Sequence, residues 1–130
     1  MLVLPDSSLF ITLMRLGFDP AETLLAHYDS TSLATCGMVR VEVMRGMRSS
    51  LAQRNLWAFL DIMINVPTTN SLWDQAARLG QRLARHGVTL KGPDLIIATC
   101  ALHVGAAVAT LDSDFQHVPD LTVLRPDWLV

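Results

Sequence analysis

The sequence predicts an α/β fold in which a short parallel sheet is flanked by helices on both faces. Short apolar runs that fit buried strands alternate with longer helical segments, and this order favours right-handed crossovers between parallel strands. The chain has 130 residues, 51% of them hydrophobic, which is enough for one core and too short for two ordinary domains. We therefore expect a single domain over residues 1–130.

The chain opens with a strand and a helix joined by an aspartate. Residues 2–4 form an apolar run that fits a buried strand, and Pro5 ends it. Asp6 follows, and Ser7-Ser8 opens an apolar helical segment that extends to residue 16. A second short helix begins at Pro20. We expect three of its residues on the inner side, namely Leu24, Leu25 and Tyr28.

The middle of the chain repeats this arrangement. Residues 33–36 fit a second buried strand, and the helix after it carries Met38, Val41 and Met44 at i, i+3 and i+6, a spacing that predicts one apolar face. Residues 51–64 predict a strongly apolar helix, which indicates a buried arm or a partner surface. Residues 64–66 predict a short third strand.

The last part of the chain combines two helices with two strands. An amphipathic helix is expected from an N-cap at Asn70-Ser71 to residue 86, with Gly87 at its C-terminal end. Its inward residues are Leu72, Ala76, Leu79 and Leu83. A buried helix follows over residues 92–101, then a strand over residues 107–111 and a last strand over residues 121–124.

Four carboxylates lie where these elements begin or end. Asp6 ends the first strand, and Glu42 lies one turn into the helix after the second strand. Asp94 begins the buried helix, and Asp112 ends the fourth strand. Strand carboxyl ends and helix amino ends share one rim of an α/β sheet, where ligands bind. The four side chains are therefore expected to meet there.

Each of these carboxylates alone also has an ordinary structural interpretation. Asp6 and Asp94 are typical helix caps, Asp112 with Asp114 is typical of an Asx turn, and Glu42 could pair with Arg45. Together, however, they would repel one another and raise their own pKa values unless cations neutralised them. A ligand set made only of oxygen atoms favours Mg²⁺ or Mn²⁺ over zinc.

Charge and composition exclude some classes of protein and favour one compartment. The formal net charge is −2, so no global positive field indicates a nucleic-acid partner. Cys36 and Cys100 lie far apart in apolar surroundings, as expected for reduced structural thiols. No basic leader begins the chain, and no apolar run approaches the roughly 18 residues that span a bilayer. We expect a cytoplasmic protein.

Four motifs follow one another along the chain. They are Asp6-Ser7-Ser8 after the first strand, Val41-Glu42-Val43, Asp94-Leu95-Ile96-Ile97-Ala98 with Ala101, and Thr110-Leu111-Asp112-Ser113-Asp114-Phe115. In this order they resemble the PIN-domain ribonucleases, and in size and layout the chain looks most like the VapC toxins of bacterial toxin–antitoxin modules. The resemblance covers about residues 2 to 125 and implies a PIN-like three-layer α/β/α fold.

The resemblance implies a site and a reaction. The family's metal-binding and catalytic acidic quartet corresponds to Asp6, Glu42, Asp94 and Asp112. Asp114 matches a second, more variable acidic position, and we favour Asp112 as the direct metal ligand. Two small hydroxyl residues that support the site correspond to Ser7 and Thr110. The implied reaction is hydrolysis of an RNA phosphodiester with Mg²⁺ or Mn²⁺ as cofactor.

The same resemblance implies partners. RNA would be the substrate, a cognate antitoxin the inhibitor, and a second copy of the chain the partner in a homodimer. Carboxylates repel RNA, so we expect Arg45, Arg48 and Lys91 to hold phosphates. Two alternatives stay open: a catalytically degenerate PIN module that binds RNA or protein, or another metal-dependent phosphohydrolase. The first strand lacks the Asp-x-Asp-x-Thr pattern of haloacid-dehalogenase-like phosphatases.

Overall fold

Five short strands, all paired in parallel, form the centre of the computed structural model, which describes residues 1–129. Three of them pair in the order β1 (Val3–Pro5), β4 (Ala107–Ala109) and β5 (Val123–Leu124). The other two, β2 (Ala34–Cys36) and β3 (Ile64–Val66), form a separate pair. A single parallel bridge between Val3 and Leu33 joins the two groups beside β1.

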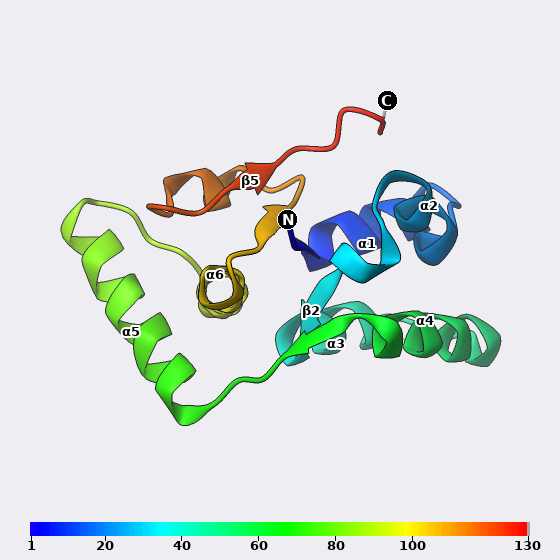
Figure 1. Ribbon diagram of the computed structural model, residues 1–130, viewed down its shortest axis with the longest axis horizontal. Helices are drawn as coiled ribbons and strands as arrows, with labels where there is room; N and C mark the ends of the chain where they lie inside the picture. The colour runs from blue at the N-terminus through cyan, green and yellow to red at the C-terminus, as the bar shows by residue number, and fades with distance from the viewer. Residues whose placement is uncertain (130) are drawn as a thin grey trace.

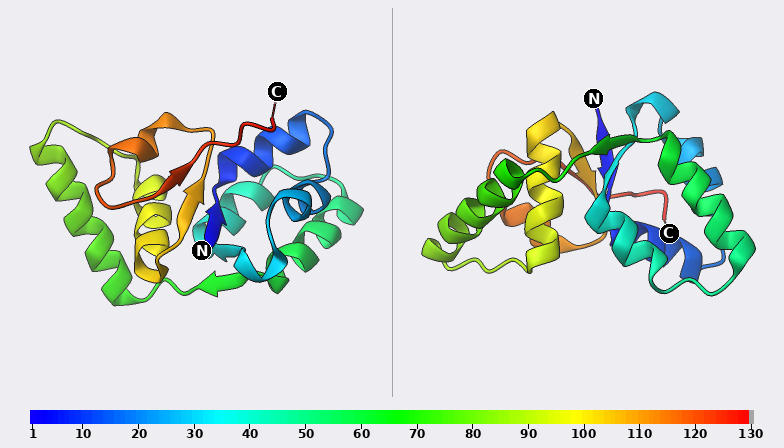
Figure 2. Two further views of the ribbon diagram at one scale, coloured as in Figure 1. Left: turned by 45° about the horizontal axis from the view of Figure 1, so that its top comes forward. Right: turned by 90° about the horizontal axis from the view of Figure 1, so that it is seen from below.

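Helices lie on both sides of these strands, as Figures 1 and 2 show. This arrangement confirms the predicted three-layer α/β/α architecture with a short parallel sheet. The helices are α1 (Ser7–Arg15), α2 (Pro20–His27), α3 (Gly37–Met44), α4 (Ser50–Ile62), α5 (Asn70–Arg85) and α6 (Gly92–Val104), with short 3₁₀ helices η1 (Ser30–Ser32) and η2 (Ser113–His117).

Helix α6 lies at the centre of the molecule and is seen end-on in Figure 1, with α5 on one side and α1 to α4 on the other. Its residues 96–101 are all buried, because the helix packs against α5, α3 and β4. A helix that is hydrophobic all round is stable only when covered in this way. Gly105 ends it with a left-handed backbone (φ 67°), which glycine adopts without strain.

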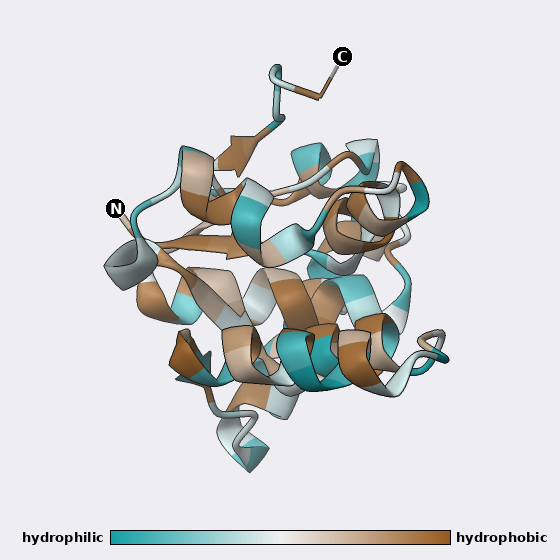
Figure 3. Ribbon diagram, turned by 90° about the vertical axis from the view of Figure 1, so that its right-hand side faces the viewer, coloured by the Kyte–Doolittle hydropathy of each residue, from teal (hydrophilic) through white to brown (hydrophobic). Residues whose placement is uncertain are grey.

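The amphipathic helix α5 has the predicted inner face, since Leu72, Ala76, Leu79 and Leu83 are all buried. Its N-cap is Thr69, one residue earlier than predicted. Thr69 has an extended backbone, and its hydroxyl accepts a hydrogen bond from the Leu72 amide at 3.2 Å. Figure 3 shows the general pattern, in which hydrophobic residues follow the strands and hydrophilic residues lie on outer helix surfaces.

The predicted apolar face of α3 is only partly confirmed, because Met38 and Met44 pack against the core but Val41 does not. Val39 and Val43 are buried, whereas Val41 is 61% exposed. Because α3 begins directly after β2, the buried strand fixes the rotation of the helix and brings the i, i+4 pair inward. Leu25 in α2 was also expected inside, but it is 42% exposed.

The strand before the Asp-Ser-Asp segment is shorter than predicted. Strand β4 ends at Ala109, so Asp112 does not end a strand. It caps η2 instead, and its carboxylate accepts a hydrogen bond from the Asp114 amide at 2.9 Å. The chain turns at this point because the side chain of Asp112 accepts the hydrogen bond that a backbone carbonyl accepts in an ordinary turn.

Helix α4 exposes part of its apolar surface. Leu56, Phe59 and Leu60 are buried, but Trp57 is 42% and Ile62 is 62% exposed. Both cysteines are free and buried, as expected. No helix within residues 1–129 has the length and hydropathy that crossing a lipid bilayer requires.

The two valines on α3 test its orientation. We predict that Val43→Ala lowers the free energy of unfolding by about 2 kcal/mol, because it removes buried methyl groups and leaves a cavity. Val41→Ala, two residues away and exposed, should change it by less than about 0.5 kcal/mol. Urea unfolding followed by circular dichroism measures both variants; equal losses would contradict the orientation.

Candidate functional site

The candidate site lies at the rim where β1 and β4 end. These neighbouring strands end together, and the Asp6 amide donates a hydrogen bond to the Ala109 carbonyl at 3.0 Å. After β1 the chain continues to β2 on one side, and after β4 it continues to β5 on the other. Such a reversal of strand order opens a crevice at the carboxyl ends of the strands. Asp6 and Thr110 follow these two strand ends directly.

Asp6 is a buried carboxylate fixed by three donors. It is 2% exposed, and its Oδ1 accepts hydrogen bonds from the Ser8 hydroxyl at 2.7 Å and the Leu9 amide at 3.3 Å. Its Oδ2 accepts from the Thr110 hydroxyl at 2.8 Å. Burial raises the pKa of Asp6 above its ordinary value, and these hydrogen bonds oppose the rise by stabilising the charged form.

Glu42 reaches the same rim from α3. Its Oε1 accepts a hydrogen bond from the Ser7 hydroxyl at 2.8 Å, which joins the start of α1 to α3. Glu42 is half-buried and has no ion pair with Arg45, the alternative that the sequence left open. Within the part of the chain that the structure describes, the one ion pair joins Arg40 to Asp61 on the outer surface.

Three further carboxylates form a cluster beside Asp6. Asp94 in the first turn of α6, Asp112 and Asp114 each offer one oxygen, and these oxygens lie within 4.8 Å of one another. The Thr110 hydroxyl, which donates to Asp6, also accepts a hydrogen bond from the Asp112 amide at 2.9 Å. Thr110 therefore connects the buried carboxylate to the cluster.

The four other carboxylates of the rim all act on Asp94. Burial raises the pKa of Asp94 to about 6, and the negative charges of Asp112, Asp6, Glu42 and Asp114 add to the rise, in that order. The structure thus brings together every acidic residue that the sequence predicted. Asp6 and Glu42 are outside the three-oxygen cluster but within its electrostatic reach.

The donor set fits a hard divalent cation. The three clustered ligands are all carboxylate oxygens, and no cationic side chain of the described residues pairs with them. Mg²⁺ and Mn²⁺ prefer oxygen ligands of this kind, whereas a zinc site would offer histidine or cysteine. A cation at this rim would offset the repulsion that adds to the effect of burial on the pKa of Asp94.

The predicted phosphate-binding residues separate into two places. Arg45 and Arg48 line a groove of about 470 Å³ that also includes Glu42. Lys91 is not part of that groove; it is exposed and immediately precedes α6, three residues before Asp94. None of the three pairs with a carboxylate among residues 1–129.

Two contributors were missed by sequence reasoning. Ser8 donates to Asp6, and its hydroxyl also accepts from the Leu111 amide at 3.4 Å, so it belongs to the same network as Thr110. Arg15, two turns along α1, lines the groove beside Glu42. The helical spacing of Ser7, Ile11 and Arg15 was the signal that could have found the arginine.

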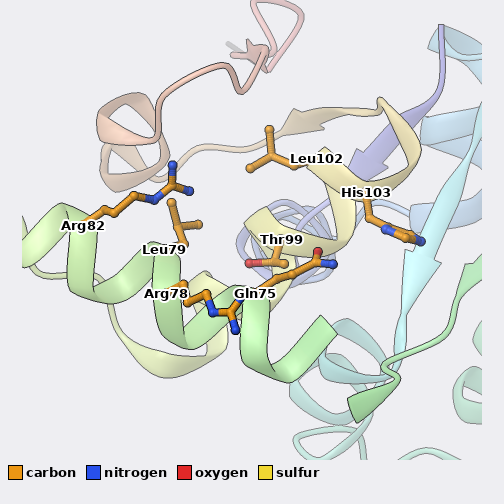
Figure 4. Close-up of a pocket in the computed structure, with 7 residues that line it drawn as sticks. All are labelled: Gln75, Arg78, Leu79, Arg82, Thr99, Leu102 and His103. Carbon is orange, nitrogen blue, oxygen red and sulfur yellow. The ribbon is translucent and has the colours of Figure 1, made fainter. Parts of the chain in front are cut away.

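A second basic hollow lies between α5 and α6, as Figure 4 shows. It has a volume of about 380 Å³ and contains no carboxylate in its lining. Arg78 and Arg82 reach it from α5, and Thr99 and His103 from α6. No residue that the sequence singled out for function lines it, so this hollow is separate from the acidic rim.

Comparisons with known proteins point to one family. A family model described as the PIN domain matches residues 3–121. Ribonuclease VapC21 of Mycobacterium tuberculosis is 33% identical over 101 residues, which cover 75% of this chain and 73% of that protein.

Two solved structures are similar in fold. VapBC2 from Rickettsia felis, bound to a DNA fragment from its promoter, has a TM-score of 0.80 at 19% identity and covers 98% of this chain and 100% of its own. FitAcB from Neisseria gonorrhoeae has a TM-score of 0.78 at 18% identity and covers 99% and 100%.

The raised pKa of Asp94 predicts an unusual effect of a conservative substitution. Because the folded-state pKa of about 6 exceeds the ordinary 3.8, the contribution of Asp94 to stability is complete below about pH 4 and is lost as the pH rises through 6. At pH 7.5 without metal, Asp94→Asn should therefore raise the free energy of unfolding. Screening of this half-buried group limits the gain to about 1 kcal/mol, or about 3 °C in Tm.

Bound metal should reverse the order of stability of the wild-type chain and the Asp94→Asn variant. Adding Mn²⁺ should raise the Tm of the wild-type chain, because an ion that binds only the folded state stabilises it, and should raise that of Asp94→Asn much less. Differential scanning fluorimetry at pH 7.5 with EDTA or Mn²⁺ measures both effects, with the exposed Asp74→Asn as the control. An Asp94→Asn variant that is less stable than the wild type without metal would contradict the described electrostatics. A variant whose Tm rises as much as that of the wild type with Mn²⁺ would contradict a ligand role for Asp94.

Proposed function

The chain belongs to the PIN domain family, and on that premise we propose that it is a metal-dependent endoribonuclease, the toxin of a toxin–antitoxin pair. The observation that carries the proposal is the convergence of five carboxylates on one rim, where the pKa of Asp94 rises to about 6 and no cationic side chain of residues 1–129 pairs with the acids. A relative at 33% identity is named a ribonuclease, which supports RNA as the substrate. The whole chain would form one such domain.

We propose Mg²⁺ or Mn²⁺ as the cofactor. When bound, such an ion supplies a lowered pKa for an attacking water molecule and offsets the negative charge of the phosphate during hydrolysis. Asp94 and Asp112 would hold it directly. Asp114 would assist at the edge of the cluster, because its amide already binds Oδ1 of Asp112 and thereby orients that carboxylate.

The remaining residues of the site would position these ligands. Asp6 completes the metal-binding set in this proposal, and Thr110 fixes it while also holding the Asp112 backbone. Ser7 holds Glu42, whose free oxygen stays available to a ligand or to water. Because these hydroxyls orient the two carboxylates, the site is prepared before substrate arrives.

RNA phosphates need positive side chains next to this negative rim. Arg45 and Arg48 are suited to the task, because they line the groove that contains Glu42 and their guanidinium groups are free of carboxylate partners among the described residues. Lys91 would contribute from the other side, just before α6. Guanidinium groups bind phosphate through two parallel hydrogen bonds, which also orients the strand.

The protein partner would be a cognate antitoxin. A further hollow of about 480 Å³, between α1, α2 and α4, is lined mainly by apolar residues, among them Phe18. Phe18 is more than half exposed, and so are Leu16 in the segment after α1 and Leu51 in α4, which do not line the hollow. Exposed apolar patches of this kind mark protein-binding surfaces. The solved structures of similar fold include VapBC complexes, which supports the assignment. A homodimer and a cytoplasmic location complete the proposal.

The direct test is cleavage of labelled RNA by the purified chain. We predict discrete fragments with Mg²⁺ or Mn²⁺ and none with EDTA, because the carboxylates alone cannot activate water. Asp112→Asn should cut the rate by at least about a hundredfold, since it removes a ligand of the ion. Asp74→Asn, an exposed carboxylate on α5 outside the rim, is the matched control and should keep full activity.

Other outcomes would select other functions. Intact RNA despite measured metal binding would favour a module that binds RNA or protein without cleaving it. Hydrolysis of a phosphomonoester without cleavage of RNA would favour a different phosphohydrolase. Either result would overturn the ribonuclease proposal, whereas fragments that persist in EDTA would overturn its metal dependence.

The salt dependence of RNA binding tests the arginines separately. Arg45→Ala should weaken binding of single-stranded RNA and make the slope of log Kd against log salt concentration shallower by about 0.7, because one phosphate contact is lost. Arg78→Ala, in the hollow between α5 and α6, should leave the slope unchanged. Binding can be followed by fluorescence anisotropy with the cleavage-deficient Asp112→Asn background; an unchanged slope for Arg45→Ala would remove it from the RNA surface.

A further inference from the structure

The groove beside Glu42 extends the candidate site in a definite direction. The Ser7 hydroxyl binds Glu42 at 2.8 Å at the start of α1. Ile11 follows Ser7 by one helical turn, and Met14 and Arg15 follow by two. All three line the groove together with Glu42, which belongs to α3. One face of α1 therefore leads from the carboxylate rim along the length of the groove.

Three cations surround this groove from separate segments. Arg15 comes from α1, Arg45 from the end of α3, and Arg48 from the segment before α4. All three are exposed, and none pairs with a carboxylate of residues 1–129. Glu42 is the one carboxylate in the lining, and it lies at the end next to the rim. The charge of the groove is therefore complementary to a chain of phosphates.

Between these charges the groove presents apolar side chains. Ile11, Met14 and Met47 line it and are all partly exposed. Met14 and Met47 also pack against the buried core, but Ile11 is not among the described residues that do so. An isoleucine with no core contact inside a basic groove provides a surface for an apolar part of a ligand. The faces of nucleic-acid bases have this property, and thioethers adapt to irregular shapes.

The neighbouring hollow differs from the groove in the charge of its lining, and this difference indicates which ligand each would bind. The groove beside Glu42 and the hollow near Phe18 share Met14, Met47 and Ala52. The hollow near Phe18 contains no arginine or lysine in its lining and includes Asp19. Cations are thus confined to the half that adjoins the carboxylates, which favours a nucleotide there. The half without cations suits an apolar segment of a protein partner.

We propose that the groove beside Glu42 is a nucleotide subsite, in which Ile11 contacts the base of a residue near the cleaved bond and Arg15 binds an adjacent phosphate. The inference rests on the proposed ribonuclease function and deepens it, because it names the part of the chain that reads the substrate. The volume of about 470 Å³ lies within the range of ordinary small-ligand sites. The subsite would set which bond in the RNA is cut.

The test uses one RNA oligonucleotide that the chain cleaves and a series of copies, each with a single abasic residue near the cleaved bond. For the wild-type chain, one abasic position should lower kcat/KM by about tenfold, because the contact between base and side chain is lost. Ile11→Ser should lower kcat/KM on the intact oligonucleotide by a similar factor. In the Ile11→Ser variant, the same abasic position should lower kcat/KM by less than about twofold, since the contact is already absent.

Two controls separate this proposal from the function on which it rests. Leu25→Ser replaces an apolar side chain of α2 that is 42% exposed and lines neither hollow, so it should retain the wild-type abasic profile. Circular dichroism and Tm confirm folding of both variants. If the wild type cleaves but Ile11→Ser shows the full abasic penalty, or if no abasic position matters, the subsite is overturned and the ribonuclease stands. If the wild type cleaves no RNA, both fail.

Discussion

The cost of holding several carboxylates together at one partly buried rim is the constraint on which this part of the fold depends. Asp6 is almost completely buried, yet three donors from α1 and from the end of β4 hold both of its oxygens. These donors stabilise the charged form that burial disfavours. Asp94 has no comparable set of donors, and burial together with the charges of four neighbouring acids raises its pKa to about 6. The fold therefore stabilises the ionised form of Asp6 through hydrogen bonds and gives that of Asp94 no such support.

The topology explains how residues so distant in sequence share this rim. Thr110 binds Asp6 across 104 positions, and Ser7 binds Glu42 across 35. Both contacts depend on parallel pairing, because only parallel strands present their carboxyl ends and the following helices at one edge. The buried helix α6 then brings Asp94 to the same edge from the opposite direction. Small hydroxyl residues occupy the junctions, where they connect the acids without adding charge.

Much of this arrangement could be predicted from the sequence, and the exceptions have physical causes. Strand–helix alternation predicted the fold and the meeting of Asp6, Glu42, Asp94 and Asp112. The apolar face of α3 was wrong at Val41, because periodicity alone does not give the rotation of a short helix that follows a strand without a loop. The end of β4 was also misplaced, because the apolar run extends beyond the last paired residue, Ala109, although the Asx turn at Asp112 and Asp114 was one of the interpretations that the sequence left open. The groove depends on packing between α1 and α3, which no local pattern reveals.

A cation site at the acidic rim can be tested most directly with a crystal grown in the presence of Mn²⁺ and measured at the manganese absorption edge. We expect an anomalous peak bounded by the carboxylates of Asp94, Asp112 and Asp114, with oxygen ligands alone from the protein. Manganese found only at other places on the surface, with Asp94 protonated and hydrogen-bonded to a neighbouring acid, would contradict the account. The carboxylates would then be a structural network rather than a metal centre.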